Sequence, residues 1–268
     1  MAMNTPSLFK NEKDSIVFLG LMAAAYANFD FQVKHQDNEL THSNGLNIFS
    51  CIIDNSDGEV LALKKNNIHL YSSPLKHSEQ LSLAHAIEKV CHKRARIKGE
   101  MSFEKYYRSK LFNDPDSTDN LNTGSTLYTT LEPCPFCTSA ILVTRMKRTV
   151  YVIPDSHYGS SFACLKSKYY AKYDMAYEKL NLENSPNNKL LQFSQSILLE
   201  LMNAAEELKK NNPNLLDTLI LDYILPILEK CHTFFLNINH ALLKTKGIEK
   251  EKNVKTLETM KKQIIIEP

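Results

Sequence analysis

Apolar residues follow two different spacings along the chain, and the change of spacing separates the predicted elements. The stretch DSIVFLGLMAAAYA, residues 14–27, is almost continuously apolar and predicts a buried helix, with Asp14 or Ser15 as its N-cap. LNIFSCIID and EVLALKKN are typical of strands, and the NSDG between them is typical of a turn. Residues 46–66 therefore predict an antiparallel hairpin.

Helices and strands alternate over the next part of the chain. SEQLSLAHAIEKVCHKRA, from residue 78, repeats apolar residues at helical spacing and predicts a helix. STLYTTL predicts a strand, and a helix is expected over 134–145, with prolines near its start, where a helix tolerates them. RTVYVI predicts another strand. This alternation indicates a layered α/β domain.

The pattern changes after Ser160, where we expect no further strand. Residues 187–212 and 214–246 are long amphipathic stretches that predict helices, and Pro226 is expected to kink the second. A lysine-rich segment near the end of the chain predicts a weaker helix. The predicted organisation is a domain over 1–165, with a long insertion at about 92–124, and an all-helical extension over 185–268.

Composition narrows the class of protein. The 268 residues are 43% hydrophobic and 23% charged, which is enough apolar material for a sizeable core. The sequence shows no basic segment followed by an apolar run at its start, and no stretch approaches a membrane span. We therefore expect a cytoplasmic protein without a membrane partner. The net charge of +2 neither demands nor excludes a nucleic-acid partner.

The segment TTLEPCPFC, residues 129–137, places two cysteines three positions apart at the predicted start of a helix. Side chains at this spacing face the same way, and their thiolates are stabilised by the positive end of the helix dipole. The 6 cysteines of the chain form no disulfide ladder, and close-spaced cysteines in a reducing compartment more often bind metal or do chemistry. A redox pair, a structural zinc site and a catalytic zinc site are the three interpretations.

His77 and Glu79 stand at the start of the preceding predicted helix. A histidine there can supply a third ligand beside Cys134 and Cys137, and a catalytic zinc keeps its fourth position for water. Glu79 can take the proton of that water and pass it to a leaving group. These are the parts that hydrolytic deamination requires.

The other interpretations explain less of the sequence. A redox pair would leave the histidine and the glutamate without a role. A structural zinc would need a fourth protein ligand, such as Cys164, His157 or His92, and none of these lies in a second paired motif. We therefore favour the catalytic zinc site.

KHSEQLSLAHAI, together with LYTTLEPCPFCTSAILVTRMKRTVYV, resembles the cytidine deaminase-like superfamily. Within it, the sequence is most similar to the branch of tRNA-adenosine deaminases and guanine deaminases. The resemblance covers roughly residues 14–160. It implies a three-layer α/β/α domain with a mixed sheet and a homodimer. It also implies Zn²⁺ held by His77, Cys134 and Cys137, with Glu79 as the catalytic proton shuttle.

The resemblance also implies substrate-binding residues. The backbone amide of Ser78 would assist the bound water, and Asn66, at the end of the second predicted strand, would fix the base. Asn67 is adjacent and could take that role instead. Asp155 falls where this branch carries a substrate-contacting aspartate. Without the resemblance, the asparagine would be interpreted as a turn residue and the aspartate as a cap.

The sequence departs from the family pattern in two places, one small and one extensive. The family alanine between the histidine and the glutamate is Ser78 here, and the inserted residues 93–110 mix basic residues with Phe103, Tyr106 and Tyr107. Such a mixture can bind single-stranded nucleic acid by charge and stacking, although a solvated insertion is the simpler interpretation. Family resemblance supplies no counterpart for the helical extension.

The expected function is zinc-dependent hydrolytic deamination of a nucleobase, with release of ammonia. The base would be of the purine type, either free, in a nucleoside or nucleotide, or in RNA. Two alternatives stay open: a pyrimidine deaminase acting on cytidine or deoxycytidylate, and a non-catalytic zinc-binding protein whose helical extension binds a partner.

Overall fold

The computed structural model describes residues 5–34, 48–67, 75–97, 124–155, 159, 161–171, 174–182, 185, 187–211 and 221–266. In chain order, the helices and strands are α1 (Thr5–Lys34), β1 (Phe49–Asp54), β2 (Val60–Lys65), α2 (Ser78–Ile97), β3 (Ser125–Leu131), α4 (Pro135–Val143), β4 (Arg148–Ile153), α5 (Ser161–Tyr169), β5 (Ala176–Lys179), α6 (Lys189–Asn211), α7 (Leu221–Asn237), the 3₁₀ turn η2 (His240–Leu242) and α8 (Gly247–Ile266).

The sheet has five strands in the order β2-β1-β3-β4-β5. β1 pairs antiparallel with β2 and β3, whereas β3, β4 and β5 pair in parallel. The expected mixed sheet is confirmed, and its β2–β1 edge is the hairpin predicted over 46–66. Because β1 is antiparallel to both of its neighbours, β2 runs in the same direction as β3, β4 and β5. The ends of these strands therefore share one edge, which we call the carboxyl edge of the sheet.

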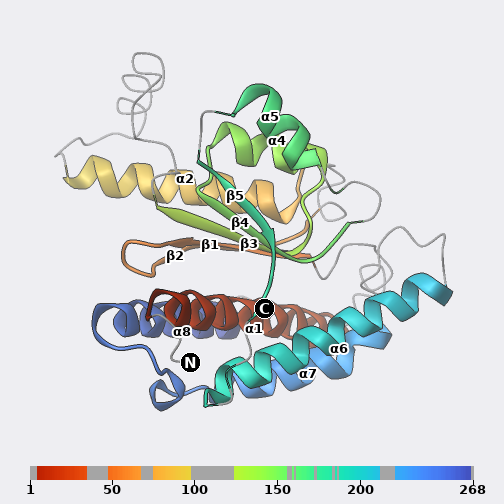
Figure 1. Cartoon of the computed structure of the whole chain (residues 1–268). Helices are drawn as coiled ribbons and strands as arrows, with labels where there is room; N and C mark the ends of the chain where they lie inside the picture. Colours follow the sequence, from red (N-terminus) through yellow and green to blue (C-terminus); the bar gives the residue numbers. More distant parts are fainter. Residues whose placement is uncertain are drawn as a thin grey trace.

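Helices cover both faces of the sheet (Figure 1). α2, α4 and α5 lie on one face, α1 and α8 lie on the other, and α6 and α7 pack beyond them. Two apolar clusters fill the spaces between these layers, the larger one on the side of α1 and the smaller one under α2 and α4. The predicted three-layer α/β/α arrangement is confirmed, and so is the helical character of the C-terminal part.

Helix α1 begins well before Asp14, so the predicted N-cap role of this residue is wrong. Asp14 is instead buried in the middle of the helix, with 1% of its surface exposed. Its carboxylate accepts hydrogen bonds from Arg148 Nη1 and Nη2, both at 2.7 Å, and from Tyr128 Oη at 2.7 Å. A carboxylate, a guanidinium and a phenol from three elements thus satisfy one another inside the protein.

Strand β5 contradicts the expectation of no strand after Ser160. Its four residues pair in parallel with β4, and β5 is the edge strand on the side of the sheet opposite β2. Tyr177 in this strand stacks on Phe162 of α5, with ring centroids 4.3 Å apart. A strand this short carries too little alternation to be recognised from sequence, and its pairing and the α5 contact hold it in place.

The C-terminal helices pack against α1 in the same apolar cluster as the sheet. Glu12 of α1, which is fully buried, accepts hydrogen bonds from Asn188 Nδ2 at 2.7 Å and from Thr245 Oγ1 at 2.7 Å. One carboxylate therefore joins the first helix to the segments that precede α6 and α8. The division into 1–165 and 185–268 stays a prediction.

Part of the predicted insertion at about 92–124 lies outside the described residues, as do Phe103, Tyr106 and Tyr107. α7 continues through Pro226. No helix in the described ranges is long and apolar enough to cross a membrane.

Candidate metal centre and its surroundings

Two helix starts bring the candidate ligands together. α2 begins at Ser78, directly after His77, and α4 begins at Pro135, with Cys134 as the extended residue before its first turn. The proline at this position costs no hydrogen bond, because the first amides of a helix have no partner within it. Cys137 follows one turn later and is fully buried. Local backbone preferences thus place the two sulfur atoms on one face of α4.

The ligand atoms of His77, Cys134 and Cys137 all lie within 4.8 Å of one another. Among the described residues, no other group of histidine, cysteine and acidic side chains is arranged in this way. Cys134 Sγ lies 3.9 Å from His77 Nδ1. A tetrahedral zinc with Zn–S of about 2.3 Å and Zn–N of about 2.0 Å would hold such atoms about 3.5 Å apart, so the residues fit this metal.

The two thiols differ in pKa. Hydrogen bonds from Cys137 and His77 lower the pKa of Cys134 to about 4, against the effect of its partial burial. The shared hydrogen bond with Cys134, together with burial, raises the pKa of Cys137. Thiolates are the form that binds metal, and a divalent cation would stabilise both.

Cys164, one of the residues considered as a fourth ligand, is exposed on α5 and is not part of this cluster. His157 and the side chain of His92 lie outside the described residues. A set of three protein ligands is typical of a catalytic zinc, which keeps one position for water.

Glu79 lies beside the cluster and is 3% exposed. Its carboxylate accepts from Ser78 Oγ at 3.2 Å and from Thr129 Oγ1 at 3.4 Å, and Cys137 Sγ approaches it at 3.6 Å. Burial raises the pKa of Glu79 above its usual value. This carboxyl group is therefore held next to the candidate metal ligands, in a site where water is largely excluded.

Asn66 and Asp155 stand at the carboxyl edge of the sheet, after β2 and β4 respectively. Asn66 is 9% exposed, and its amide oxygen has no hydrogen-bond partner among the described residues. Burying a polar atom without a hydrogen-bond partner costs free energy. Asp155 is partly buried and donates its backbone amide to Glu132 Oε2 at 3.1 Å.

Three of the site's neighbours were not singled out from the sequence. Thr129 contacts Glu79, and Glu132 accepts a hydrogen bond from the backbone amide of Asp155. The ring of Phe136 meets that of His77 edge to face, at a centroid distance of 6.5 Å. All belong to the TTLEPCPFC segment. The motif indicates that this segment belongs to the site, but only the fold shows which partner each side chain contacts.

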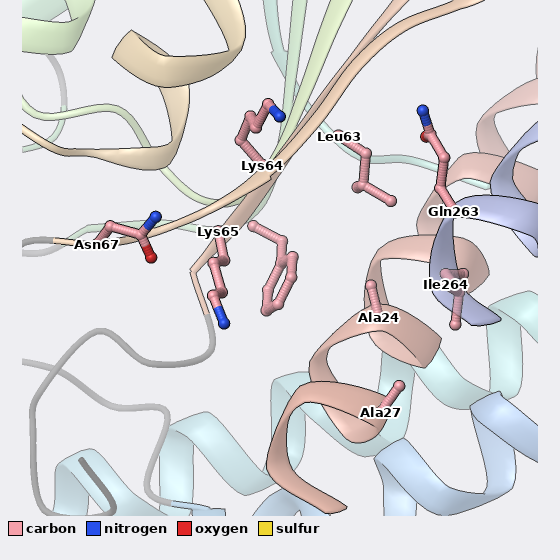
Figure 2. A pocket seen from close by; sticks show the side chains of 9 residues that line it. Ala24, Ala27, Leu63, Lys64, Lys65, Asn67, Gln263 and Ile264 are labelled. Carbon is pink, nitrogen blue, oxygen red and sulfur yellow. The ribbon is translucent and has the colours of Figure 1, made fainter. Parts of the chain in front are cut away.

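A pocket of about 180 Å³ lies elsewhere, between α1, the edge strand β2 and α8 (Figure 2). Figure 2 shows Lys64 and Lys65 pointing to opposite sides of β2. None of the three candidate metal ligands lines this pocket, nor does Glu79. Its lining residues are Ala24, Ala27, Phe49, Leu63, Lys64, Lys65, Asn67, Gln263 and Ile264.

Comparison with known proteins agrees with the site. Residues 32–153 match the family described as cytidine and deoxycytidylate deaminase zinc-binding region, which is less than half of the chain of 268 residues. This stretch contains the histidine, the glutamate and both cysteines of the cluster. The resemblance to the cytidine deaminase-like superfamily and the prediction of zinc as cofactor are confirmed.

A curated relative is the tRNA-specific adenosine deaminase of Bacillus subtilis (strain 168), with 30% identity over 105 residues. The match takes in 39% of this chain, and the chain spans about half (48%) of the length of that relative.

Solved structures with a similar chain include one from a study of A-to-I editing by tRNA:A34 deaminases at the wobble position of transfer RNA. It has 21% identity, a TM-score of 0.34, and coverage of 50% of this chain and 77% of that chain. Guanine deaminase from Bacillus subtilis has 18% identity and a TM-score of 0.28, and the match covers 56% of this chain and 78% of that chain. At these TM-scores the likeness carries no weight for the substrate.

Proposed function

We propose that this protein is a zinc-dependent hydrolytic deaminase of nucleobases. The observation that carries the proposal is the cluster of His77, Cys134 and Cys137, with the buried carboxylate of Glu79 in contact with Cys137. Three ligands and an adjacent proton acceptor form a hydrolytic site, whereas a structural zinc needs four ligands and no such acceptor.

His77, Cys134 and Cys137 would hold the metal. When bound, zinc supplies a Lewis acid that brings the pKa of a water molecule close to neutrality. Glu79 is placed to take up one proton from the attacking water and to deliver it to the departing amine. The base then exchanges its C–NH₂ bond for a C=O bond, one water is consumed and one ammonia is released.

The carboxyl edge of the sheet would hold the base. The amide oxygen of Asn66, which has no partner in the part of the chain that the structure describes, would accept a hydrogen bond from a ring N–H or an exocyclic amine, and this bond would offset the cost of burying the group. Asp155, at the end of β4, would contact the substrate from the other side. Ser78 would contribute its backbone amide to the bound water, while its hydroxyl orients Glu79.

A purine-type substrate is our first choice, and the sequence relationship with a tRNA-specific adenosine deaminase supports it. The base could be free, in a nucleoside or nucleotide, or in RNA. A pyrimidine deaminase acting on cytidine or deoxycytidylate is the second candidate, because the matching family is described by those substrates.

A homodimer is also part of the proposal. Phe136 is 46% exposed and Val143 is 63% exposed, and the two lie seven positions apart on α4, which places them on one face of the helix. A second copy of the chain would cover this apolar face. We place the protein in the cytoplasm, where a reducing environment keeps cysteine ligands available.

The test is ammonia release by zinc-loaded protein from guanine, adenine, adenosine, cytosine, cytidine, deoxycytidylate and tRNA, with Glu79→Gln as the matched variant. Glutamine keeps the shape of the side chain but cannot carry the proton, so release should fall at least about 100-fold. Release from a purine would support the first choice, and release from a pyrimidine alone would select the second. No release from any of them at full zinc occupancy would overturn the proposal.

A further inference from the structure

Glu132 is buried next to the site, and the proposed reaction gives it no role. It follows β3 directly and is 6% exposed. Its backbone amide bonds to Ile153 O at 2.8 Å and so continues the β3–β4 pairing, which any residue could do. The carboxylate is therefore not needed for the β3–β4 pairing, and a charge at this depth needs partners to offset its burial.

Two of the groups that contact this carboxylate come from other parts of the fold. Asp155 donates its backbone amide to Oε2 at 3.1 Å, and Tyr177 Oη of β5 lies 3.4 Å from Oε1. Tyr177 is itself held by its stacking on Phe162. Burial and the negative charge of Glu132 together raise the pKa of Tyr177. Glu132 is thus fixed by β5 on one side and fixes the first residues after β4 on the other.

Two residues after β4, Asp155 and Gly159, lie against this carboxylate. Gly159 donates its amide to Asp155 O at 3.1 Å. A Cβ atom at Gly159 would lie 2.3 Å from Glu132 Oε2 and 2.4 Å from Asp155 O, far closer than atoms approach in proteins. The absence of a side chain at this position is what allows the backbone to reach the carboxylate.

We infer that Glu132 is a positioning residue, whose carboxylate holds the backbone at Asp155 against the strand that leads to the metal ligands. Only Pro133 separates Glu132 from Cys134. The segment that carries a metal ligand and the segment that carries the proposed substrate contact are thereby joined through one side chain. This inference rests on the proposed function for its effect on substrate, but not for the contact itself.

The first test does not depend on activity. Amide exchange at Asp155 would be followed by TROSY NMR in the full-length, zinc-loaded protein. Glu132→Ala removes the acceptor, so exchange at this amide should quicken at least about tenfold, while Glu132→Gln keeps an acceptor oxygen and should restore most of the protection. Unchanged exchange in the alanine variant would overturn the inference, whatever the protein catalyses.

The second test asks whether the positioning serves the substrate. On the base that the wild type deaminates, Glu132→Ala should raise KM about tenfold, change kcat less, and leave the zinc content at the wild-type level. Gly159→Ala should act in the same direction, because its methyl group displaces the carboxylate. Gly124→Ala is the matched glycine control, since the nearest atom to its added Cβ lies 3.9 Å away.

The outcomes separate the two proposals. A wild type that releases no ammonia would remove the proposed function, and the exchange measurement would still decide the role of Glu132. An active enzyme in which Glu132→Ala loosens the Asp155 amide but leaves KM unchanged would show that the contact is only structural, and would overturn the positioning role. A fall in zinc content would do the same, because the residue would then serve the metal ligands.

Discussion

Replacement of Asp14 by alanine tests a buried ion pair that links α1 to the sheet. The carboxylate is 1% exposed and accepts three hydrogen bonds, two from Arg148 and one from Tyr128. Only 14% of the Arg148 side chain is exposed. Removal of the Asp14 carboxylate leaves Arg148 with Glu178 as its remaining acidic partner among the residues that the structure describes.

The expected loss is set by the part of the buried Arg148 charge that Asp14 no longer balances. Removing one partner of a buried ion pair costs about 3–5 kcal/mol, whereas losing a helix cap costs about 1 kcal/mol. The free energy of unfolding, measured by urea denaturation with far-UV circular dichroism, should therefore fall by about 3–5 kcal/mol in Asp14→Ala. The magnitude distinguishes the observed buried role from the cap role that the sequence suggests.

Glu200→Ala is the control for this measurement, because it also removes a carboxylate from a cation, Lys230, but at the surface. Its cost should stay within about 1 kcal/mol. A loss for Asp14→Ala as small as that of the control would refute the reasoning.

Three further predictions use other features of the fold. Burial lowers the pKa of Lys13 from 10.5 to about 8, so the unfolded chain binds more protons between these values and the free energy of unfolding should rise with pH there. Lys13→Met should flatten that rise in urea titrations at several pH values, and an equal slope would contradict it. Gly58 has φ +73°, and an added Cβ would lie 2.3 Å from Lys252 O, so Gly58→Ala should cost more than about 1 kcal/mol by the same assay; a neutral effect would contradict this. Cys134→Ala should lose stoichiometric zinc by mass spectrometry of metals, whereas exposed Cys164→Ala should keep it; equal zinc in both would remove Cys134 from the ligand set.

Much of the sheet was predictable because its signals are local. The hairpin of β1 and β2 followed from two apolar runs around NSDG, and α2 followed from apolar spacing after residue 78. The cluster of candidate metal ligands was predictable because residue type and spacing at two helix starts limit what the side chains can reach. These features depend on neighbours in the sequence.

The features that sequence did not reveal depend on distant partners. Asp14 was predicted to be a cap because its partner Arg148 lies 134 positions away in the sequence, so no local pattern indicates the buried ion pair. β5 is held by pairing with β4 and by the stacking of Tyr177 on Phe162, and neither contact leaves a pattern in four residues. Glu132 stood inside a recognised motif, but its contacts are with a backbone amide after β4 and with Tyr177 in β5, a strand that the sequence did not indicate.

The most direct test of the central claim is the origin of the oxygen atom in the product. The base from which the protein releases ammonia would be incubated with zinc-loaded protein in ¹⁸O-labelled water, and the mass of the product would be measured by mass spectrometry. Hydrolytic deamination predicts one ¹⁸O atom per product and one ammonia per turnover, with both lost in Glu79→Gln. Product without the label, or label and ammonia that persist in Glu79→Gln, would contradict the account.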